Sequence, residues 1–190
     1  MNYSIILDYI ASNVIVYISH ILIYFLWYNL FFLTFGEQTI ILYLPHGIIV
    51  LGFLFFGIKI TLGLLLSQIS FYIISLNYNF NLPFSDYLII SLFQLICMPL
   101  TLFILNRLGI TVGDRSHKLD KTNILHVLII AFLSSTILGI SIIFSTLFLM
   151  NQINLSIFIL GSFLGSAILI LTMKVLVHIS YLFSTFLKNY

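Results

Sequence analysis

His46 is the residue of this sequence best suited to chemistry, because it lies between Pro45 and Gly47 within a long apolar run. Proline lacks a backbone N–H and glycine is a weak helix former, so the pattern predicts a break in a helix. Inside a membrane, the backbone groups freed by such a break are tolerated where they line a cavity or pack against protein. His46 is therefore a candidate ligand or proton site. The alternative is a kink whose imidazole caps the freed carbonyl groups.

Four further polar residues lie within apolar runs and could converge with His46 on one pocket: Asn29, Gln68, Gln94 and Ser162. If each run crosses a membrane, all of them except Gln68 lie about 9–14 Å below the outer surface, at about 1.5 Å per residue. Gln68 lies nearer the midplane. We expect these five side chains to form a ligand-binding pocket that opens outward. The alternative is that each one only hydrogen-bonds to a neighbouring helix, which is worth about 0.6 kcal/mol.

A stripe of small residues near the C-terminus predicts close helix packing. Gly161-x-x-x-Gly165 is overlapped by Ser162-x-x-x-Ser166. Small residues at this spacing let two helix backbones approach each other within a membrane. We expect Gly161, Gly165 and Ser166 to pack within the bundle, and dimerisation is the alternative.

Catalytic and cofactor-binding motifs are absent from the sequence. It has no phosphate-binding glycine loop, dinucleotide fingerprint, His-Glu-x-x-His or nucleophile elbow. Cys97 is the one cysteine, and the histidines are too scattered for the usual zinc spacing. The basic residues are too few to support nucleic-acid binding. We therefore expect no enzymatic activity, no metal, no cofactor and no nucleic-acid partner.

The composition indicates an integral membrane protein. The chain is 62% hydrophobic and 6% charged, whereas soluble domains carry about 25% charged residues. A water-soluble globule could not bury this much apolar surface. The apolar runs are long and continuous, which favours membrane-spanning helices and an all-α fold.

The spacing of polar residues predicts one bundle of six transmembrane helices within a single domain, 1–190. About 20 apolar residues cross a bilayer, so the apolar block from Gln38 to Leu76 is long enough for two spans. Read as one span, it would bury Lys59 at a cost of about 2.5–3.5 kcal/mol. We therefore place a tight turn at Gly57-Ile58-Lys59. The expected spans are 10–35, 38–57, 60–76, 86–106, 122–150 and 155–174, with Pro99 kinking the fourth.

Charge placement predicts the orientation of this bundle. With the N-terminus in the cytoplasm, every lysine and arginine falls on the cytoplasmic side, in agreement with the positive-inside rule. Both termini are then cytoplasmic, and a bacterial inner membrane is the expected location. The tail, 175–190, is apolar and aromatic. It could extend the sixth span or lie in the membrane interface.

The segment around His46 resembles the first type of the membrane-associated sensor (MASE) domains of bacteria. That family carries a Trp-Pro-Pro-Ala-Gly-Ile segment, a Gly-basic turn and a second helix with spaced glycines. Here Pro45-His46-Gly47-Ile48, Phe55-Phe56-Gly57-Ile58-Lys59 and Gly63 follow that order. Leu160-Gly161-Ser162-Phe163-Leu164-Gly165 is similar to the family's later Leu-Gly-Asp-x-x-Gly segment. The family's alanine is His46 here, and its aspartate is Ser162.

The resemblance implies a sensor domain. Its members are typically longer and carry a cytoplasmic output domain, so this chain is expected to be a truncated, stand-alone version. A weaker similarity, in length, span number and glycine content, is to the substrate-binding components of energy-coupling-factor transporters.

We expect a lipid-embedded domain that binds a small molecule or senses membrane state, and signals through a cytoplasmic or membrane partner protein. A small-solute transporter, or its substrate-binding subunit, is one alternative. A structural subunit of a membrane complex is another.

Overall fold

The computed structural model describes residues 3–32, 43–76, 84–109, 124–146 and 155–188. The prediction of an all-α fold is confirmed for these residues, all of whose regular elements are helical, whereas the predicted number of six spans stays a prediction. Their bounds are α1 Tyr3–Trp27, a π-helical turn η1 Tyr28–Phe32, α3 Leu44–Phe56, a 3₁₀ turn η3 Gly57–Ile60, α4 Thr61–Ser75, α5 Phe84–Arg107, α6 Ile124–Thr146 and α7 Leu155–Lys188. The described residues include four helical stretches long and apolar enough to cross a membrane, Tyr3–Leu30, Leu44–Ile74, Tyr87–Arg107 and Ile157–Leu176, besides the shorter apolar stretch Leu125–Ser141.

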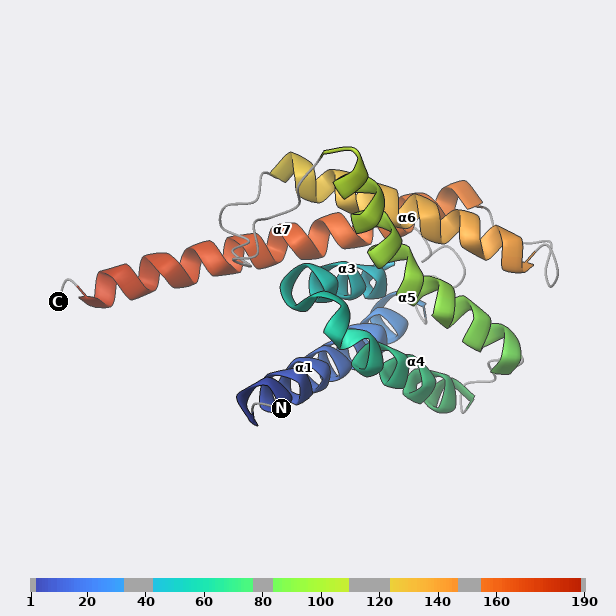
Figure 1. Cartoon of the computed structure of the whole chain (residues 1–190), viewed down its shortest axis with the longest axis horizontal. Coiled ribbons are helices and arrows are strands. Elements are labelled where there is room, and N and C mark those ends of the chain that lie inside the picture. Colours follow the sequence, from blue (N-terminus) through green and yellow to red (C-terminus); the bar gives the residue numbers. More distant parts are fainter. Residues whose placement is uncertain (1–2, 33–42, 77–83, 110–123, 147–154, 189–190) are drawn as a thin grey trace.

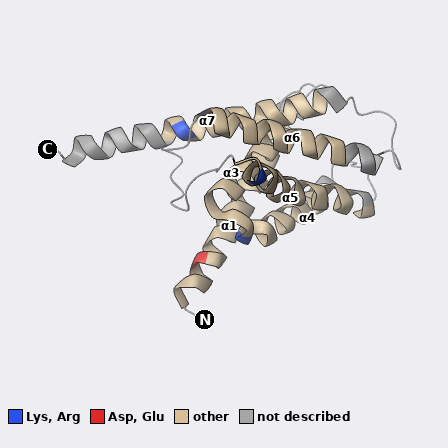
Figure 2. Ribbon diagram, turned by 45° about the horizontal axis from the view of Figure 1, so that its top comes forward, with Lys and Arg blue, Asp and Glu red and all other residues tan. Residues whose placement is uncertain are grey.

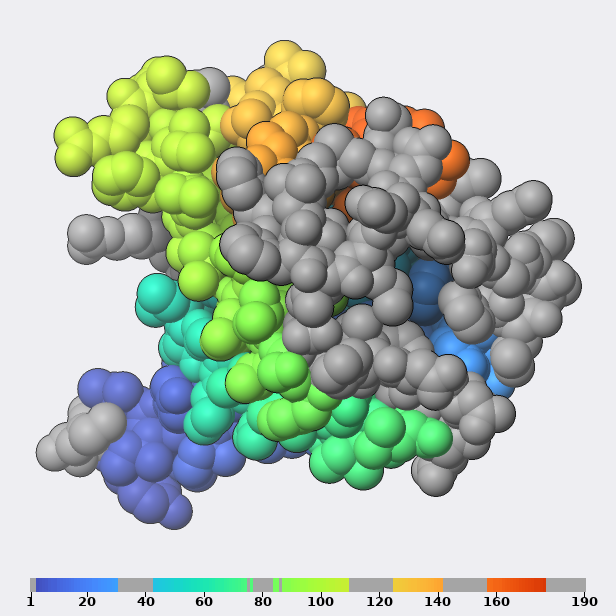
Figure 3. Space-filling view, turned by 90° about the vertical axis from the view of Figure 1, so that its right-hand side faces the viewer, coloured from blue at the N-terminus to red at the C-terminus, as the bar shows by residue number. Residues whose placement is uncertain are grey.

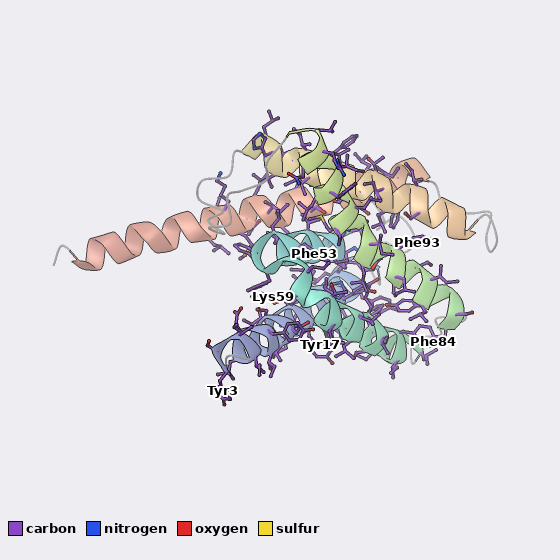
Figure 4. The ribbon with its side chains drawn as sticks, viewed as in Figure 1. Tyr3, Tyr17, Phe53, Lys59, Phe84 and Phe93 are labelled. Carbon is purple, nitrogen blue, oxygen red and sulfur yellow. The ribbon has the colours of Figure 1, made fainter. Side chains whose placement is uncertain are left out.

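Helix α3 is the centre of the bundle. It packs against α1, α5, α6 and α7, and Figure 1 shows it between α1 and α7. Its apolar side chains are buried on nearly every side, and Ile49 and Val50 are fully enclosed. Phe53 contributes to the same core, and Figure 4 labels it on α3 beside the turn that carries Lys59. A helix that is apolar all round is expected where every face meets protein or lipid.

Pro45 lies in the first turn of helix α3, which continues without interruption through Gly47. Tyr43 is not helical, with φ −85° and ψ 79°, and α3 starts at Leu44 with proline in its first turn. The first N–H groups of a helix have no intrahelical partner, so a proline there removes no hydrogen bond. The part of the predicted second span before Tyr43 lies outside the described residues. Pro99, by contrast, lies inside the continuous helix α5.

The chain turns between α3 and α4 at Gly57, whose φ of 68° favours glycine. The two helices contain 13 and 15 residues, so each is only about 20–23 Å long. That is shorter than the roughly 30 Å of a bilayer's hydrocarbon core. The second apolar block is therefore a pair of short helices.

The helix directions alternate along the chain. Helices α1 and α4 run parallel, because His20 contacts Ser67 and Tyr24 stacks on Phe71 one turn further along both helices. Figure 3 shows α5 crossing one face of the molecule, from α4 toward α6. The predicted tail belongs to α7, which continues past Lys174 to Lys188 and extends beyond the other helices in Figure 1.

The charged side chains that the structure describes are few, and Figure 2 shows them on α1, at the α3–α4 turn, on α5 and on α7. Asp8, which is within α1 and not before it, pairs with Lys59 at the α3–α4 turn. Arg107 ends α5, and Figure 2 shows further basic charge on α7, beyond its middle. The exposed Asp8–Lys59 pair is expected to add about 0–1 kcal/mol to stability.

Asn13 ties α1 to the start of α4 near this pair. Its Nδ2 donates to the Lys59 carbonyl at 2.8 Å and to the Tyr9 carbonyl at 2.8 Å, and its Oδ1 accepts from the Gly63 N–H at 2.6 Å. A Cβ on Gly63 would collide with the Asn13 backbone, so the two helices touch directly. One amide therefore satisfies backbone groups that the turn and the helix start would otherwise leave unpaired.

Asn13→Leu is expected to lower the free energy of unfolding by about 1–3 kcal/mol, because the buried Gly63 N–H loses its partner. The control is Asn29→Leu, since Asn29 bonds only to the Phe25 carbonyl of its own helix, at 2.8 Å. That change should cost about 0.6 kcal/mol or less. Reversible unfolding in mixed micelles measures both variants. An equal loss of unfolding free energy in the two variants would show that the hydrogen bonds of Asn13 between α1 and α4 add no more stability than the bond of Asn29 within its own helix.

Candidate functional site

Each of the six described α-helices contributes buried polar side chains to the interior of the bundle. We call this set the polar layer, and none of its members exposes more than 5% of its surface. It consists of His20 on α1, His46 on α3, Ser67 and Gln68 on α4, Ser91 and Gln94 on α5, Ser134 and Ser135 on α6, and Ser162 and Ser166 on α7. Polar groups at this depth are costly unless they are paired, so their partners decide what the layer can do.

A chain of hydrogen bonds links four side chains, three of them on α1, α4 and α5 and the fourth on Tyr43, the residue before α3. Gln68 Nε2 donates to Gln94 Oε1 at 2.9 Å, and Gln94 Nε2 donates to the Tyr43 hydroxyl at 3.2 Å. The Tyr43 and Tyr24 hydroxyls are 2.8 Å apart. The Tyr87 hydroxyl also donates to the backbone carbonyl of Gln68 at 3.0 Å. The chain joins α4, α5, α1 and the start of α3.

Two histidine–serine pairs lie beside this chain. Ser67 Oγ is 2.9 Å from His20 Nδ1, between α4 and α1. His46 Nε2 is 3.1 Å from Ser134 Oγ, between α3 and α6.

Helix α7 meets the start of α3 at the small-residue stripe. The Tyr43 N–H donates to the Gly161 carbonyl at 3.0 Å. A Cβ on Gly165 would collide with the backbone of Tyr43 and Leu44, and one on Gly47 would lie 3.0 Å from the Cα of Ser166. The first turn of α3 is therefore the neighbour that the small residues Gly161, Gly165 and Ser166 contact.

Aromatic rings cover the polar layer on the side away from Lys59. Tyr24 stacks on Phe71 at 3.7 Å between ring centroids, and Trp27 meets Tyr43 edge-on at 5.2 Å. Tyr87 and Tyr72 complete this aromatic cluster. The cluster presents both hydroxyl groups and ring faces, so it can contact polar and apolar parts of a ligand.

Several polar atoms of the layer have no hydrogen-bond partner among the described residues. They are His20 Nε2, His46 Nδ1, Gln68 Oε1 and Ser162 Oγ. Leaving such an atom buried without a partner costs about 1–3 kcal/mol. These four atoms lie on four helices, α1, α3, α4 and α7.

Of the five predicted ligand-binding residues, the structure joins Gln68 and Gln94 directly and buries His46 and Ser162 in the same bundle interior. Gln68 and Gln94 bond to each other, His46 lies one turn from Tyr43, and Ser162 follows the Gly161 that bonds to Tyr43. Asn29 does not join them, because its amide bonds to its own helix.

Sequence reasoning missed His20, Tyr24 and Tyr43. The available signal was the spacing of Asn13, Val16, His20, Tyr24 and Trp27, which places them all on the buried face of α1. Tyr43 gave no such signal, because its position before a helix depends on where α3 begins.

The polar layer consists of neutral or titratable amide, hydroxyl and imidazole groups. Among the described residues, the buried polar groups include no carboxylate, lysine or arginine, and no cluster of metal-ligating side chains occurs. Neutral amide, hydroxyl and imidazole groups can orient a small molecule by hydrogen bonds. No family model, curated protein or solved structure matches the chain.

Proposed function

We propose that the chain is a membrane-embedded, sensor-like domain that binds a small ligand in its polar layer and signals through a partner protein. The observation that carries the proposal is the set of unpaired atoms on His20, His46, Gln68 and Ser162, which come from four different helices. A molecule bonded to them would contact α1, α3, α4 and α7 at once. Its occupancy would therefore favour one arrangement of these helices over another.

Helix α7 is the element best suited to pass such a change onward. It begins beside the first turn of α3 and continues for 34 residues to Lys188, a length of about 51 Å. A small tilt of α7 at the contact between Gly165 and Tyr43 would displace the far end of this helix by a larger distance, provided that the helix is rigid. The partner would bind at that end or at the loop 107–121. In the orientation expected from charge, both lie in the cytoplasm of a bacterial cell.

Hydrogen–deuterium exchange of the full chain in lipid nanodiscs tests ligand binding without assuming a ligand. The probe is a polar metabolite extract of the source cells, compared with a mock extract. We expect slower exchange at the start of α3, whose N-terminus has no side-chain cap and whose first amides therefore report on added partners.

Two variants sharpen this experiment. Gln68→Leu removes an unpaired acceptor, so at least ten times more extract should be needed to give the same protection. Asn29→Leu should leave the required extract concentration unchanged. If no extract fraction protects the folded wild-type protein, the binding function is wrong, and a structural subunit of a larger complex is the better interpretation.

A transporter, or its substrate-binding subunit, is the second candidate function. The observation in its favour is the pair of short helices α3 and α4 that meet at Gly57, because discontinuous helices are frequent at transport sites. The two candidates differ in one outcome. A transporter moves the protecting compound into proteoliposomes, and a sensor only binds it.

A further inference from the structure

Two histidines of the polar layer each use only one of their two ring nitrogens. His20 Nδ1 is 2.9 Å from Ser67 Oγ, and His46 Nε2 is 3.1 Å from Ser134 Oγ. The other nitrogens, His20 Nε2 and His46 Nδ1, have no hydrogen-bond partner among the described residues, and both side chains are fully buried. Each ring is therefore satisfied on one side and bare on the other.

Protonation has the same consequence in either tautomer of these rings. A neutral imidazole can bond to its serine by donating its N–H or by accepting the hydroxyl proton at its bare nitrogen. The imidazolium ion carries an N–H on both nitrogens, so its partnerless nitrogen is always a donor. The ion would thus bury a positive charge and an N–H without an acceptor, which is strongly unfavourable.

No carboxylate among the buried residues that the structure describes could balance such an ion. Two acidic residues lie on the helices packed around the rings. Asp8 pairs with Lys59 and lies twelve residues before His20, about 18 Å along α1, and Asp86 lies in the first turn of α5. The tyrosines and the cysteine of these helices are uncharged near neutral pH. The remaining basic residues there would oppose a further positive charge, and they are Arg107, His126 and Lys174.

His46 acts where α6 meets α3. Ser135, Thr136 and Ser141 on α6 bond to carbonyl groups of their own helix, whereas Ser134 also bonds to His46. Helix α6 begins at Ile124, directly after the loop 107–121. A change at His46 is therefore felt by the helix that follows one of the two places where the partner is proposed to bind.

We propose that the two histidine–serine pairs make the bundle sensitive to acid: the packed arrangement holds both rings neutral, and a proton on either ring favours an arrangement in which its helices separate and the imidazolium meets water. Acidification is then a signal that the domain receives at the polar layer. This inference deepens the proposed function, and it rests on that function for the step from the layer to the partner protein.

Linkage between protonation and packing gives the direction and the size of the effect. A histidine in water takes up its proton near pH 6.5, so the packed arrangement is fully favoured above this pH and loses stability below it. For one ring that is protonated only in the open arrangement, the ratio of open to packed protein rises about tenfold between pH 7.5 and 5.5. Two such rings give about a hundredfold. Carboxylates ordinarily titrate near pH 4, below this window.

Hydrogen–deuterium exchange of the full chain in lipid nanodiscs measures the opening of each helix. Exchange rates are divided by those of the unfolded chain at the same pH, which removes the direct effect of pH on exchange. We expect the opening of α3 and α6 to increase at least tenfold from pH 7.5 to 5.5. The same increase is expected for α1 and α4, which His20 and Ser67 join.

His46→Gln replaces the ring by an amide that can still bond to Ser134 but takes up no proton in this range. It should remove about tenfold of the acid response at α3 and α6, and His20→Gln should do the same at α1 and α4. The control is His126→Gln, which leaves both histidine–serine pairs intact and should respond as the wild type does. An equal acid response in His46→Gln and the wild type would overturn the proposal.

The wild-type chain decides the question even if the glutamine variants do not fold. In ring-labelled protein at pH 5.5, nitrogen NMR signals should show at least two of the five histidines neutral while α3 and α6 remain protected. All five rings charged in a protected bundle would contradict the proposal. If acid opens no helix while the metabolite extract still protects α3, the acid response is wrong and ligand binding stands. If acid opens the bundle and no extract protects it, the acid response stands and ligand binding is wrong.

Discussion

Replacing Gly165 by alanine is expected to lower the free energy of unfolding by about 1–3 kcal/mol, although it adds only one methyl group. The new Cβ would collide with the carbonyl group of Tyr43 and with the nitrogen of Leu44. These are backbone atoms, which cannot rotate away as a side chain can. Helix α7 would have to withdraw from α3, and the bond from the Tyr43 N–H to the Gly161 carbonyl would lengthen from 3.0 Å.

Gly52→Ala is the matched control, because it makes the same chemical change within α3. The nearest atom there is the end of the Ile60 side chain, at 2.7 Å, and the next neighbours are methyl groups of Val16 at 3.5 and 3.6 Å. A flexible side-chain end can move, and alanine is favoured over glycine in a helix by about 0.5–1 kcal/mol. We expect this variant to be close to neutral. Unfolding in mixed micelles compares the two, and similar losses would mean that the contact between α7 and α3 is not tight.

Gln94→Leu is expected to cost about 1–3 kcal/mol, because it leaves the buried Gln68 side chain without its hydrogen-bond partner. Gln68→Leu should cost a similar amount, since Gln94 Oε1 then loses its donor. The double variant removes both amides and should lose clearly less than the sum of the two. The expected coupling energy is about 0.5–3 kcal/mol, the range for residues in direct contact.

The control cycle pairs Gln68→Leu with Thr101→Val. Thr101 is also buried on α5, but its hydroxyl bonds to the Cys97 carbonyl of the same helix at 2.7 Å. These two changes should add within about 0.5 kcal/mol. Strict additivity of Gln68→Leu and Gln94→Leu would contradict the hydrogen bond between α4 and α5.

The sequence by itself determined the environment and the helical class of the protein. Long runs with very few charges can satisfy their backbone groups in a membrane only as helices, so composition alone leads to this result. Local chemistry also predicted the turn around Gly57 and Lys59. A charge in the middle of an apolar block has few stable positions, and a glycine beside it permits the change of direction.

The role of Pro45 depended on information that the sequence does not hold. Proline next to glycine is compatible with a kink inside a helix and with the first turn of a helix. The choice depends on whether the preceding residue is helical, and Tyr43 is not. The backbone N–H of Tyr43 instead donates a hydrogen bond to the carbonyl of Gly161, more than a hundred residues away in the chain.

The composition of the polar layer was decided by tertiary structure alone. Asn29 and Gln94 are both amides within apolar helices. Asn29 bonds to a backbone carbonyl of its own helix, whereas Gln94 on α5 bonds to Gln68 on α4 and to Tyr43, which precedes α3. The difference comes from which face of each helix meets a neighbour, and that depends on the packing of all the helices together. Helical membrane segments specify their own backbone hydrogen bonds, whereas side-chain partners come from other helices. The sequence therefore predicted that polar residues lie within apolar helices, and only the packing around α3 decided which of them are buried and which of them meet.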